Sequence, residues 1–259
     1  VGFQGGEPLL HPEFEKFCNY ALSKIGYENL GLWTTFPEGF ERYRKTICRT
    51  FKHIFLNDHT RNDIYHHPGL VAIEDVIKDK NVMWYLIDHC WAQESWSASI
   101  NPKGAFFCEI AAAFAMLPTN EQDENTEAWD VEPNWWWRTP KDFTKQIEKW
   151  CPRCGFAVNL ERRISTDEID DISISNYERM KNYSKKIKQN KYRISDLKIV
   201  SLEETKNLAS YKDFDYRNKI ASRYGIYLTI NDQCFWTPHL IENYVKQKSY
   251  LEILQEKHR

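Results

Sequence analysis

The first ninety residues alternate between short apolar runs and longer stretches with apolar positions at helical spacing. Val1–Gln4, Leu30–Phe36 and Lys52–Leu56 are short and apolar, which is typical of buried strands. Between them, 11–25 and 38–51 repeat apolar residues every three or four positions, as amphipathic helices do. The pattern predicts an α/β fold built from parallel strand–helix–strand units, whose ligands bind beyond the C-terminal ends of the strands.

The pattern changes after residue 90, where tryptophan and cysteine become frequent. We expect a hairpin over Ile100–Cys108 and a short helix over Glu109–Met116. After residue 170 a polar helical stretch follows, with strands expected at Lys198–Ser201 and Gly225–Thr229. A last helix is expected from His239 onward.

Net charge divides the chain near residue 170, where the polar helical stretch begins. Residues 1–170 carry 18 basic and 26 acidic side chains, whereas 171–259 carry 17 basic and 11 acidic ones, so the net charges are −8 and +6. This change of sign predicts a boundary near residue 170. The most basic stretch, Lys181–Arg193, is either a solvated face or a site for an anionic ligand.

Composition excludes several classes of protein. The chain of 259 residues is 42% hydrophobic, enough for a sizeable core, and it contains no apolar run long enough to span a membrane. Lysine and arginine number 35 against 37 acidic residues, which argues against a general nucleic-acid binder. No secretory signal is recognised, so we expect a cytoplasmic protein without a disulfide framework.

The seven cysteines fall into two groups. Cys18 and Cys48 lie on apolar helix faces and Cys234 is similar, so we expect these three to pack in the core. Four thiolates suit either tetrahedral Zn²⁺ or an iron–sulfur cluster. Zinc ribbons normally use two Cys-x2-Cys pairs and this chain has one, which favours iron–sulfur. The predicted metal ligands are Cys90, Cys108, Cys151 and Cys154, and the alternative is that these four are unrelated core thiols.

The segment Gly5-Gly6-Glu7-Pro8 lies where the first strand ends and a helix follows. Two glycines lack the Cβ atoms that would keep a ligand away from the backbone. Glu7 adds a negative charge suited to an ammonium group, and Pro8 stiffens the exit. The alternative is an ordinary strand-to-helix turn.

These four residues resemble the GGEP motif that follows the second strand of radical S-adenosylmethionine (SAM) enzymes. The resemblance implies that residues 1–88 are the truncated portion of an incomplete (β/α)6 partial TIM-like barrel. It implies that Gly5, Gly6, Glu7 and Pro8 hold the methionyl amino group of SAM, and that Lys52–Leu56 is the fourth strand. Asn57, just beyond that strand, then lies beside the ribose.

The cysteine-rich part is similar to the twitch or SPASM domains of the same family. Cys90, 13 residues, Gly104, three residues and Cys108 precede the pair Cys151/Cys154. The resemblance implies that 89–170 binds one auxiliary [4Fe–4S] cluster through these four cysteines. The Gly-to-Cys spacing is one residue shorter than usual, and the additional cysteines of a full SPASM domain are missing. The resemblance does not extend to 171–259, which we expect to be a basic α/β C-terminal extension.

The family's Cys-x3-Cys-x2-Cys loop, which carries the SAM-binding [4Fe–4S] cluster, does not occur in this sequence. We expect it on a missing N-terminal segment, so that this chain is inactive alone. The complete enzyme is expected to be an oxidoreductase that uses a 5′-deoxyadenosyl radical on a peptide, sugar or other small metabolite, with an external electron donor. The alternative is a non-enzymatic Zn-binding interaction module.

Other polar residues are expected near the mouth of the barrel. His59, His66 and His67 could bind a metal with Asp58, although we favour a loop that lines the opening. Trp135–Trp137 either stack on a sugar or nucleobase or cover the cluster. Glu74 and Asp75 are either substrate contacts or the polar face of a helix. The remaining candidates are Thr34, Thr35, Arg61 and Asp63.

Overall fold

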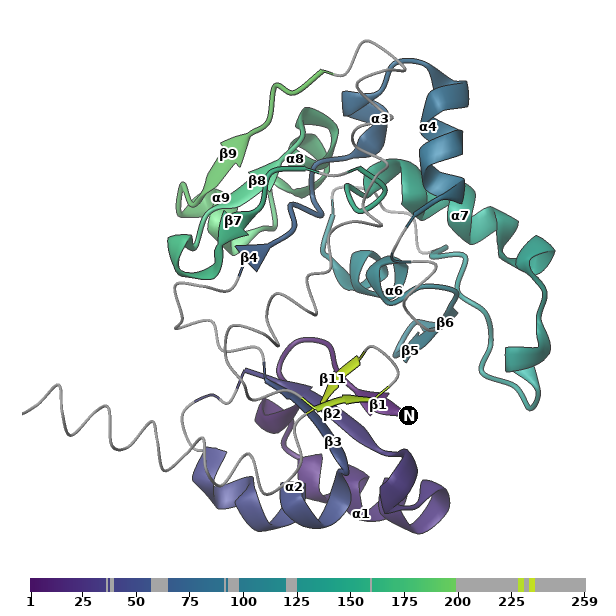
Figure 1. Cartoon of the computed structure of the whole chain (residues 1–259). Helices are drawn as coiled ribbons and strands as arrows, with labels where there is room; N and C mark the ends of the chain where they lie inside the picture. The colour runs from purple at the N-terminus through teal and green to yellow at the C-terminus, as the bar shows by residue number, and fades with distance from the viewer. Residues whose placement is uncertain are drawn as a thin grey trace, which may run out of the picture. The chain divides into compact units, whose positions relative to one another are not determined.

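The chain divides into two units, each with a core of its own. The computed structural model describes residues 1–35, 37, 40–56, 65–90, 92, 98–119, 125–158 and 160–198, and two short strands at 228–230 and 233–235 (Figure 1). The first unit comprises Val1–Ile64 with Asp215–Arg259, and the second comprises Tyr65–Phe214. The expected boundaries at 88 and 170 both fall inside the second unit.

The first unit is built on a parallel sheet. Strands β1 (Gly2–Phe3), β2 (Gly31–Thr34) and β3 (His53–Leu56) pair side by side in chain order. Gly2 pairs with Gly31, and Leu32 pairs with Ile54. The three expected strands are thus confirmed, and so is their parallel direction.

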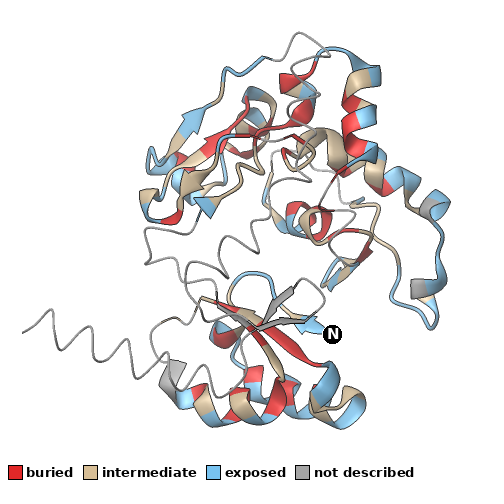
Figure 2. Ribbon diagram, in the orientation of Figure 1, coloured by how far each residue is buried: buried red, intermediate tan, exposed pale blue. Residues whose placement is uncertain are grey.

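Two helices connect these strands and pack against the same sheet. Helix α1 (Phe14–Ile25) joins β1 to β2, and α2 (Arg44–Thr50), preceded by the 3-10 turn η3 (Phe40–Tyr43), joins β2 to β3. Apolar positions of both helices share one core with the sheet (Figure 2), whose innermost members include Phe14, Cys18, Leu30, Leu32, Ile47, Phe51 and Ile54.

Sequential parallel strands joined by helices occur both in a β/α barrel and in one half of a doubly wound sheet. Among the described residues the parallel sheet has three strands and does not close into a barrel. The same unit contains the antiparallel pair β10 (Leu228–Ile230) and β11 (Gln233–Phe235), close to the strand expected at Gly225–Thr229. The strand expected at 198–201 and the helix expected from His239 lie outside the described residues.

The second unit combines several small sheets with short helices. The expected hairpin is present as β5 (Ser99–Asn101) and β6 (Gly104–Phe106), and the expected helix is α6 (Glu109–Met116). Two further strand pairs belong to this unit: β4 (Tyr65–His66) pairs with β7 (Arg163–Ile164), and β8 (Asp170–Ile172) pairs in parallel with β9 (Tyr192–Ile194). Its other helices are α3 (Ile73–Val76), α4 (Lys80–Asp88), α7 (Thr144–Trp150), α8 (Ile174–Met180) and α9 (Lys185–Lys188). Its 3-10 turns are η4 (Trp135–Trp137), η5 (Pro140–Phe143), η6 (Cys151–Arg153) and η7 (Ser165–Asp167).

Gly104 closes the hairpin in a conformation that only glycine adopts readily. Its φ is +133°, and a Cβ atom there would come within 2.4 Å of the carbonyl oxygen of Trp129. The backbone N–H of Ala105 donates to that same oxygen at 2.9 Å. The glycine therefore allows the segment around Trp129 to pair with the hairpin, just before Cys108.

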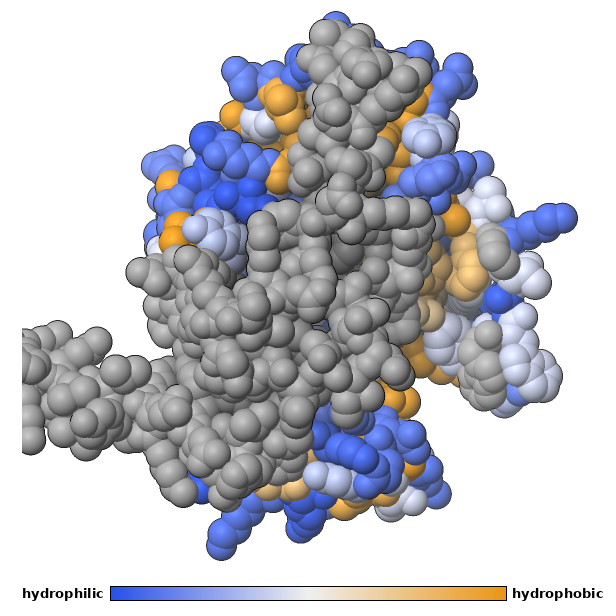
Figure 3. Space-filling model, in the orientation of Figure 1, coloured by the Kyte–Doolittle hydropathy of each residue, from blue (hydrophilic) through white to orange (hydrophobic). Residues whose placement is uncertain are grey.

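Most of the basic side chains in Lys181–Arg193 pair with carboxylates of the same unit. Lys186 contacts Asp170 at 2.7 Å, and Arg193 contacts the buried carboxylate of Asp171 at 2.6 Å. Lys181 pairs with Glu178 and Lys191 with Glu168. The space-filling view shows hydrophilic residues gathered over the α9 and β9 side of the unit (Figure 3). This pairing favours a solvated face over an anion-binding site.

No helix within the described part of the chain combines the length and the apolar character needed to cross a membrane.

The aromatic contacts of the first core yield a stability prediction. Phe51 is fully buried, and its ring lies 5.3 Å from Phe3 and 6.3 Å from Phe14. Phe51→Ala should lower the free energy of unfolding by about 3–5 kcal/mol, because it leaves a cavity in a closed core. Urea denaturation measures this change in the free energy of unfolding. Phe17→Ala, at an exposed position of α1, is the control and should cost less than about 1 kcal/mol.

Candidate functional site

The turn after β1 exposes its backbone. Gly5 and Gly6 have φ angles of +89° and +55°, in the region that favours glycine. A Cβ atom built on either residue would meet nothing within 4 Å, so both face open space. Glu7 follows and precedes the 3-10 turn η1 (Pro8–Leu10). A ligand can therefore approach the Gly5–Gly6 backbone closely.

The Glu7 carboxylate fastens this turn to the C-terminal end of β2. Oε1 accepts from the Thr34 hydroxyl at 2.7 Å and from the Leu9 N–H at 3.0 Å. Oε2 accepts from the backbone N–H of Thr35 at 2.6 Å and from its hydroxyl at 2.7 Å. Thr34 is almost completely buried. Glu7 thus joins the ends of two adjacent strands.

These contacts change the expected role of Glu7. A carboxylate offers about four acceptor positions, and the chain itself occupies four. All four donors are uncharged, so the carboxylate keeps its negative charge at the strand ends. The charge still attracts a cation, whereas an ammonium group that contacts the carboxylate directly has to compete with these four donors.

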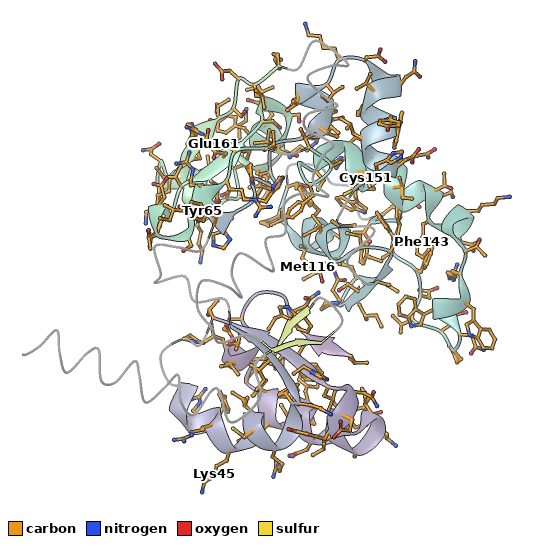
Figure 4. The ribbon with its side chains drawn as sticks, in the orientation of Figure 1. Lys45, Tyr65, Met116, Phe143, Cys151 and Glu161 are labelled. Carbon is orange, nitrogen blue, oxygen red and sulfur yellow. The ribbon has the colours of Figure 1, made fainter. Side chains whose placement is uncertain are left out.

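The four predicted metal ligands come from three separate segments of the second unit. Cys90 follows α4, and Cys108 immediately precedes α6. Cys151 begins η6 at the end of α7, where Figure 4 labels it, and Cys154 follows η6. All four are thiols rather than halves of disulfides. Cys90 and Cys108 are buried. Segments as distant as residues 90 and 154 therefore contribute sulfur to the same unit.

The four thiols lie within electrostatic range of one another. Burial raises the pKa of Cys151 well above its usual value, and the charges of Cys154, Cys90 and Cys108 raise it further. Burial likewise raises the pKa of Cys154, to which Cys90 and Cys108 add. For Cys108 burial raises the pKa to about 11, with a smaller contribution from Cys90. Cys108, Cys151 and Cys154 are thus protonated at neutral pH.

In the described residues no three His, Cys, Asp or Glu side chains already meet as a metal-binding group. The four thiols thus share one neighbourhood without the tight geometry of a closed ligand set. A cation among them would favour the thiolates, since it offsets both the burial and the mutual repulsion that raise their pKa values. The chemistry of this donor set fits a metal or cluster that takes thiolate ligands.

Backbone N–H groups point toward two of the sulfurs. The N–H of Phe156 donates to Sγ of Cys154 at 3.4 Å. Cys108 lies at the N-terminus of α6, where the N–H groups of Ile110 and Ala111 oppose the rise in its pKa. Both arrangements stabilise negative charge on sulfur, as thiolate ligands require.

An apolar shell surrounds these sulfurs. Cys108 and Trp150 belong to one buried cluster, against which Cys154 packs, and Cys151 packs against a second cluster. The indole N–H of Trp150 donates to the carbonyl oxygen of Thr126 at 3.0 Å. Trp137 is 73% exposed, so its ring does not shield the thiols as expected for that triplet. Trp150 packs in the cluster of Cys108 and Cys154, and Trp84 packs against the cluster that Cys151 contacts.

The backbone around Cys154 is held by hydrogen bonds from outside the Cys-x2-Cys turn. The N–H of Ile73 donates to the carbonyl oxygen of Cys154 at 3.2 Å. The N–H of Gly155 donates to the carbonyl oxygen of Gly69 at 2.9 Å. A Cβ atom on Gly155 would lie 2.6 Å from the carbonyl oxygen of Pro68, so a glycine is required here. The segment 67–73 therefore lies against the turn along its backbone.

His67 belongs to this contact and is not placed as a metal ligand through Nε2. Its Nε2 lies 2.9 Å from the carbonyl oxygen of Gly155, and its ring packs on Phe156 at 4.7 Å. Burial lowers the pKa of His67 from 6.5 to about 4, although the hydrogen bond to Gly155 opposes the shift. The imidazole is therefore neutral, and Nε2 carries the hydrogen because a carbonyl oxygen can only accept.

The remaining candidates divide between structural contacts and positions outside the described residues. Glu74 pairs with Arg179 at 3.0 Å, and Asp75 accepts from the N–H of Ser175 at 2.9 Å. Both carboxylates thus serve the polar face of α3, and His66 lies on β4. The predictions for Asn57, Asp58, His59, Arg61 and Asp63 lie outside the described residues.

Two residues fasten the cysteine-bearing turn. Sequence reasoning named His67 only as a possible metal ligand or part of a loop that lines the opening, and it missed the amide Asn176. Asn176 lies on α8 and donates through Nδ2 to the carbonyl oxygens of Arg153 and Leu70. Its partners are 23 and 106 residues away. No local pattern marks such a residue, although a single asparagine in an apolar helix face is a usable signal for a buried hydrogen-bonding role.

Comparison with known proteins finds no matching family model, no matching curated protein and no matching solved structure.

The Glu7 contacts predict a loss of stability on a nearly isosteric change. Glu7→Gln should lower the free energy of unfolding by about 1–3 kcal/mol, because its amide nitrogen cannot accept from Thr35 and leaves those donors unsatisfied. Chemical denaturation measures the change. Glu13→Gln, which removes the exposed ion pair with Lys16, is the control and should cost no more than about 0.5 kcal/mol. Equal effects of the two variants would contradict the assignment.

The lowered pKa of His67 predicts acid sensitivity. The unfolded chain binds a proton near pH 6.5, whereas folded His67 does not until about pH 4, so stability falls as the pH drops through this window. Between pH 7.5 and pH 4 the wild-type chain should lose about 3 kcal/mol relative to His67→Gln. Urea denaturation in the presence of a chelator measures the difference. Parallel pH profiles of the two proteins would contradict it.

Proposed function

We propose that this chain belongs to a radical SAM oxidoreductase, in which Cys90, Cys108, Cys151 and Cys154 hold an auxiliary [4Fe–4S] cluster. The observation that carries the proposal is the gathering of four thiols from three segments into mutual electrostatic range, two of them buried and two half-buried. Four cysteines that share one neighbourhood without forming disulfides are the donor set that such a group requires. A thiolate-binding group explains that arrangement.

The chain supplies what such a group needs beyond its four ligands. Phe156 and the N-terminus of α6 direct N–H groups toward two sulfurs, and these hydrogen bonds tune the potential of a bound cluster. Trp150 and the surrounding apolar side chains exclude water from the sulfurs. A cluster bound here supplies one-electron transfer to or from a substrate.

The first unit supports the SAM-binding part of the proposal. The open backbone of Gly5 and Gly6 lets a ligand approach closely, with the negative charge of Glu7 beside it. Pro8 fixes the start of the following turn, and Asn57 is the proposed contact to the ribose. These residues would hold SAM, which would supply hydrogen-atom abstraction once a reduced SAM-binding cluster donates one electron to it.

Some components of this activity must come from elsewhere. The SAM-cleaving cluster needs a Cys-x3-Cys-x2-Cys loop, which this sequence does not contain, so the chain alone should not cleave SAM. An external electron donor completes the proposed system, and the substrate is a peptide or another small molecule. The alternative, a zinc-binding interaction module, uses the same four sulfurs in one tetrahedral site.

Metal analysis after anaerobic reconstitution separates the two. The 259-residue chain should bind about four iron and four sulfide ions, with a visible absorbance that fades on reduction. One zinc ion without sulfide would instead favour the interaction module. Replacing Cys90, Cys108, Cys151 and Cys154 by serine should abolish iron binding. Cys48→Ser, at a half-buried position in the first unit, is the control and should leave the iron content unchanged.

A further inference from the structure

Three consecutive carbonyl groups of the cysteine-bearing turn are bound by donors from outside it. The first and third accept from side chains: Nδ2 of Asn176 donates to the oxygen of Arg153 at 2.8 Å, and Nε2 of His67 donates to that of Gly155 at 2.9 Å. The middle carbonyl, that of Cys154, accepts from a backbone N–H. The turn therefore has its backbone orientation set at every residue from 153 to 155.

We infer that His67 and Asn176 are positioning residues, which hold the turn Cys151–Cys154 in the conformation in which both sulfurs bind one metal or cluster. This inference rests on the proposed thiolate site and adds two residues to it. Neither side chain contacts the metal in this arrangement. Each acts through a backbone carbonyl next to the sulfur-bearing residue.

His67 is suited to this role by its surroundings. Its ring packs on Phe156 with the ring centroids 4.7 Å apart, and its Nε2 faces the carbonyl oxygen of Gly155. Phe156 in turn donates its N–H to Sγ of Cys154. The ring of His67 therefore packs on Phe156, whose N–H binds the sulfur of Cys154. Its Nε2 also binds the carbonyl of Gly155, the residue between Cys154 and Phe156. Moving His67 would disturb both contacts.

Asn176 connects the turn to a segment beyond the charge boundary near residue 170. Its side chain is only 2% exposed, and Nδ2 donates to Leu70 at 2.9 Å as well as to Arg153. Next to it, the hydroxyl of Ser173 accepts from the N–H of Ala72 at 3.0 Å. Helix α8 and the segment 67–73 thus hold the turn from two sides. Part of the basic extension belongs to the site.

Such support matters because an unrestrained Cys-x2-Cys turn must be ordered when it binds. The ordering lowers affinity, whereas a turn already held by buried hydrogen bonds binds without that loss. Residues that orient metal ligands from behind typically change metal affinity 10- to 100-fold when they are replaced. The structure therefore predicts a selective loss of affinity, separate from any loss of fold.

Cobalt binding to the whole reduced chain tests the inference. Co²⁺ with thiolate ligands has a visible spectrum, so one titration reports both affinity and ligand geometry. His67→Phe, which keeps a ring against Phe156, and Asn176→Leu should each weaken binding about 10- to 100-fold and reduce the thiolate band. His67→Gln keeps an N–H donor and should restore most of the affinity. Glu74→Gln, which loosens α3 from α8 without touching the turn, is the control.

The outcomes distinguish this inference from the proposed function. If the wild-type chain binds cobalt through thiolates and His67→Phe and Asn176→Leu bind it equally well, the positioning role is wrong and the thiolate site stands. If the wild-type chain binds no cobalt, both are wrong. Circular dichroism of the metal-free proteins measures folding. If both variants lose their fold without metal, His67 and Asn176 are structural residues and the inference is overturned.

Discussion

The placement of four cysteines from three segments in one neighbourhood is the constraint on which the proposed chemistry of the second unit depends. Burial and neighbouring ionisable sulfur raise the pKa of Cys108, Cys151 and Cys154, so these thiols stay protonated when no cation lies among them. A bound cation reverses this preference, because it stabilises the thiolates and the protons leave. The four cysteines therefore make sense as a ligand set. The N–H groups aimed at Cys154 and Cys108 fit the same interpretation, since they favour the ionised sulfur.

In the first unit, one carboxylate joins two strand ends. Glu7 takes donors from Leu9, Thr34 and Thr35, and so fixes the glycine turn relative to the neighbouring strand. Because none of these donors is charged, the turn is rigid and still negative. A parallel sheet places such turns at one edge, where their backbone is open to a ligand. The rigidity of the turn and its attraction for a cation thus have the same origin.

Local pattern predicted the parts of this protein that local physics determines. The strands at 31–34 and 53–56 follow from short apolar runs, α1 follows from its helical spacing with Gly26 at its end, and α6 follows from an alanine-rich stretch after Cys108. The candidate ligands were found because cysteine spacing is itself local. The distant partners of Glu7, His67 and Asn176 were not found, because they lie 23 to 106 residues away and depend on how the units fold. Trp137 was expected to cover the thiols, whereas Trp150 packs there, since position in the fold rather than residue type decides shielding.

The boundary near residue 170 shows how charge and packing can divide a chain differently. Net charge changes sign there because the following surface is rich in lysine, and surface charge costs little to vary. The buried side of the same segment carries Ser173 and Asn176, whose hydrogen bonds reach Ala72, Leu70 and Arg153. These bonds lie in the interior, where a lost partner leaves a buried carbonyl or N–H unsatisfied. The packing therefore continues across the charge boundary, and the residues that support the cysteine-bearing turn lie on both sides of it.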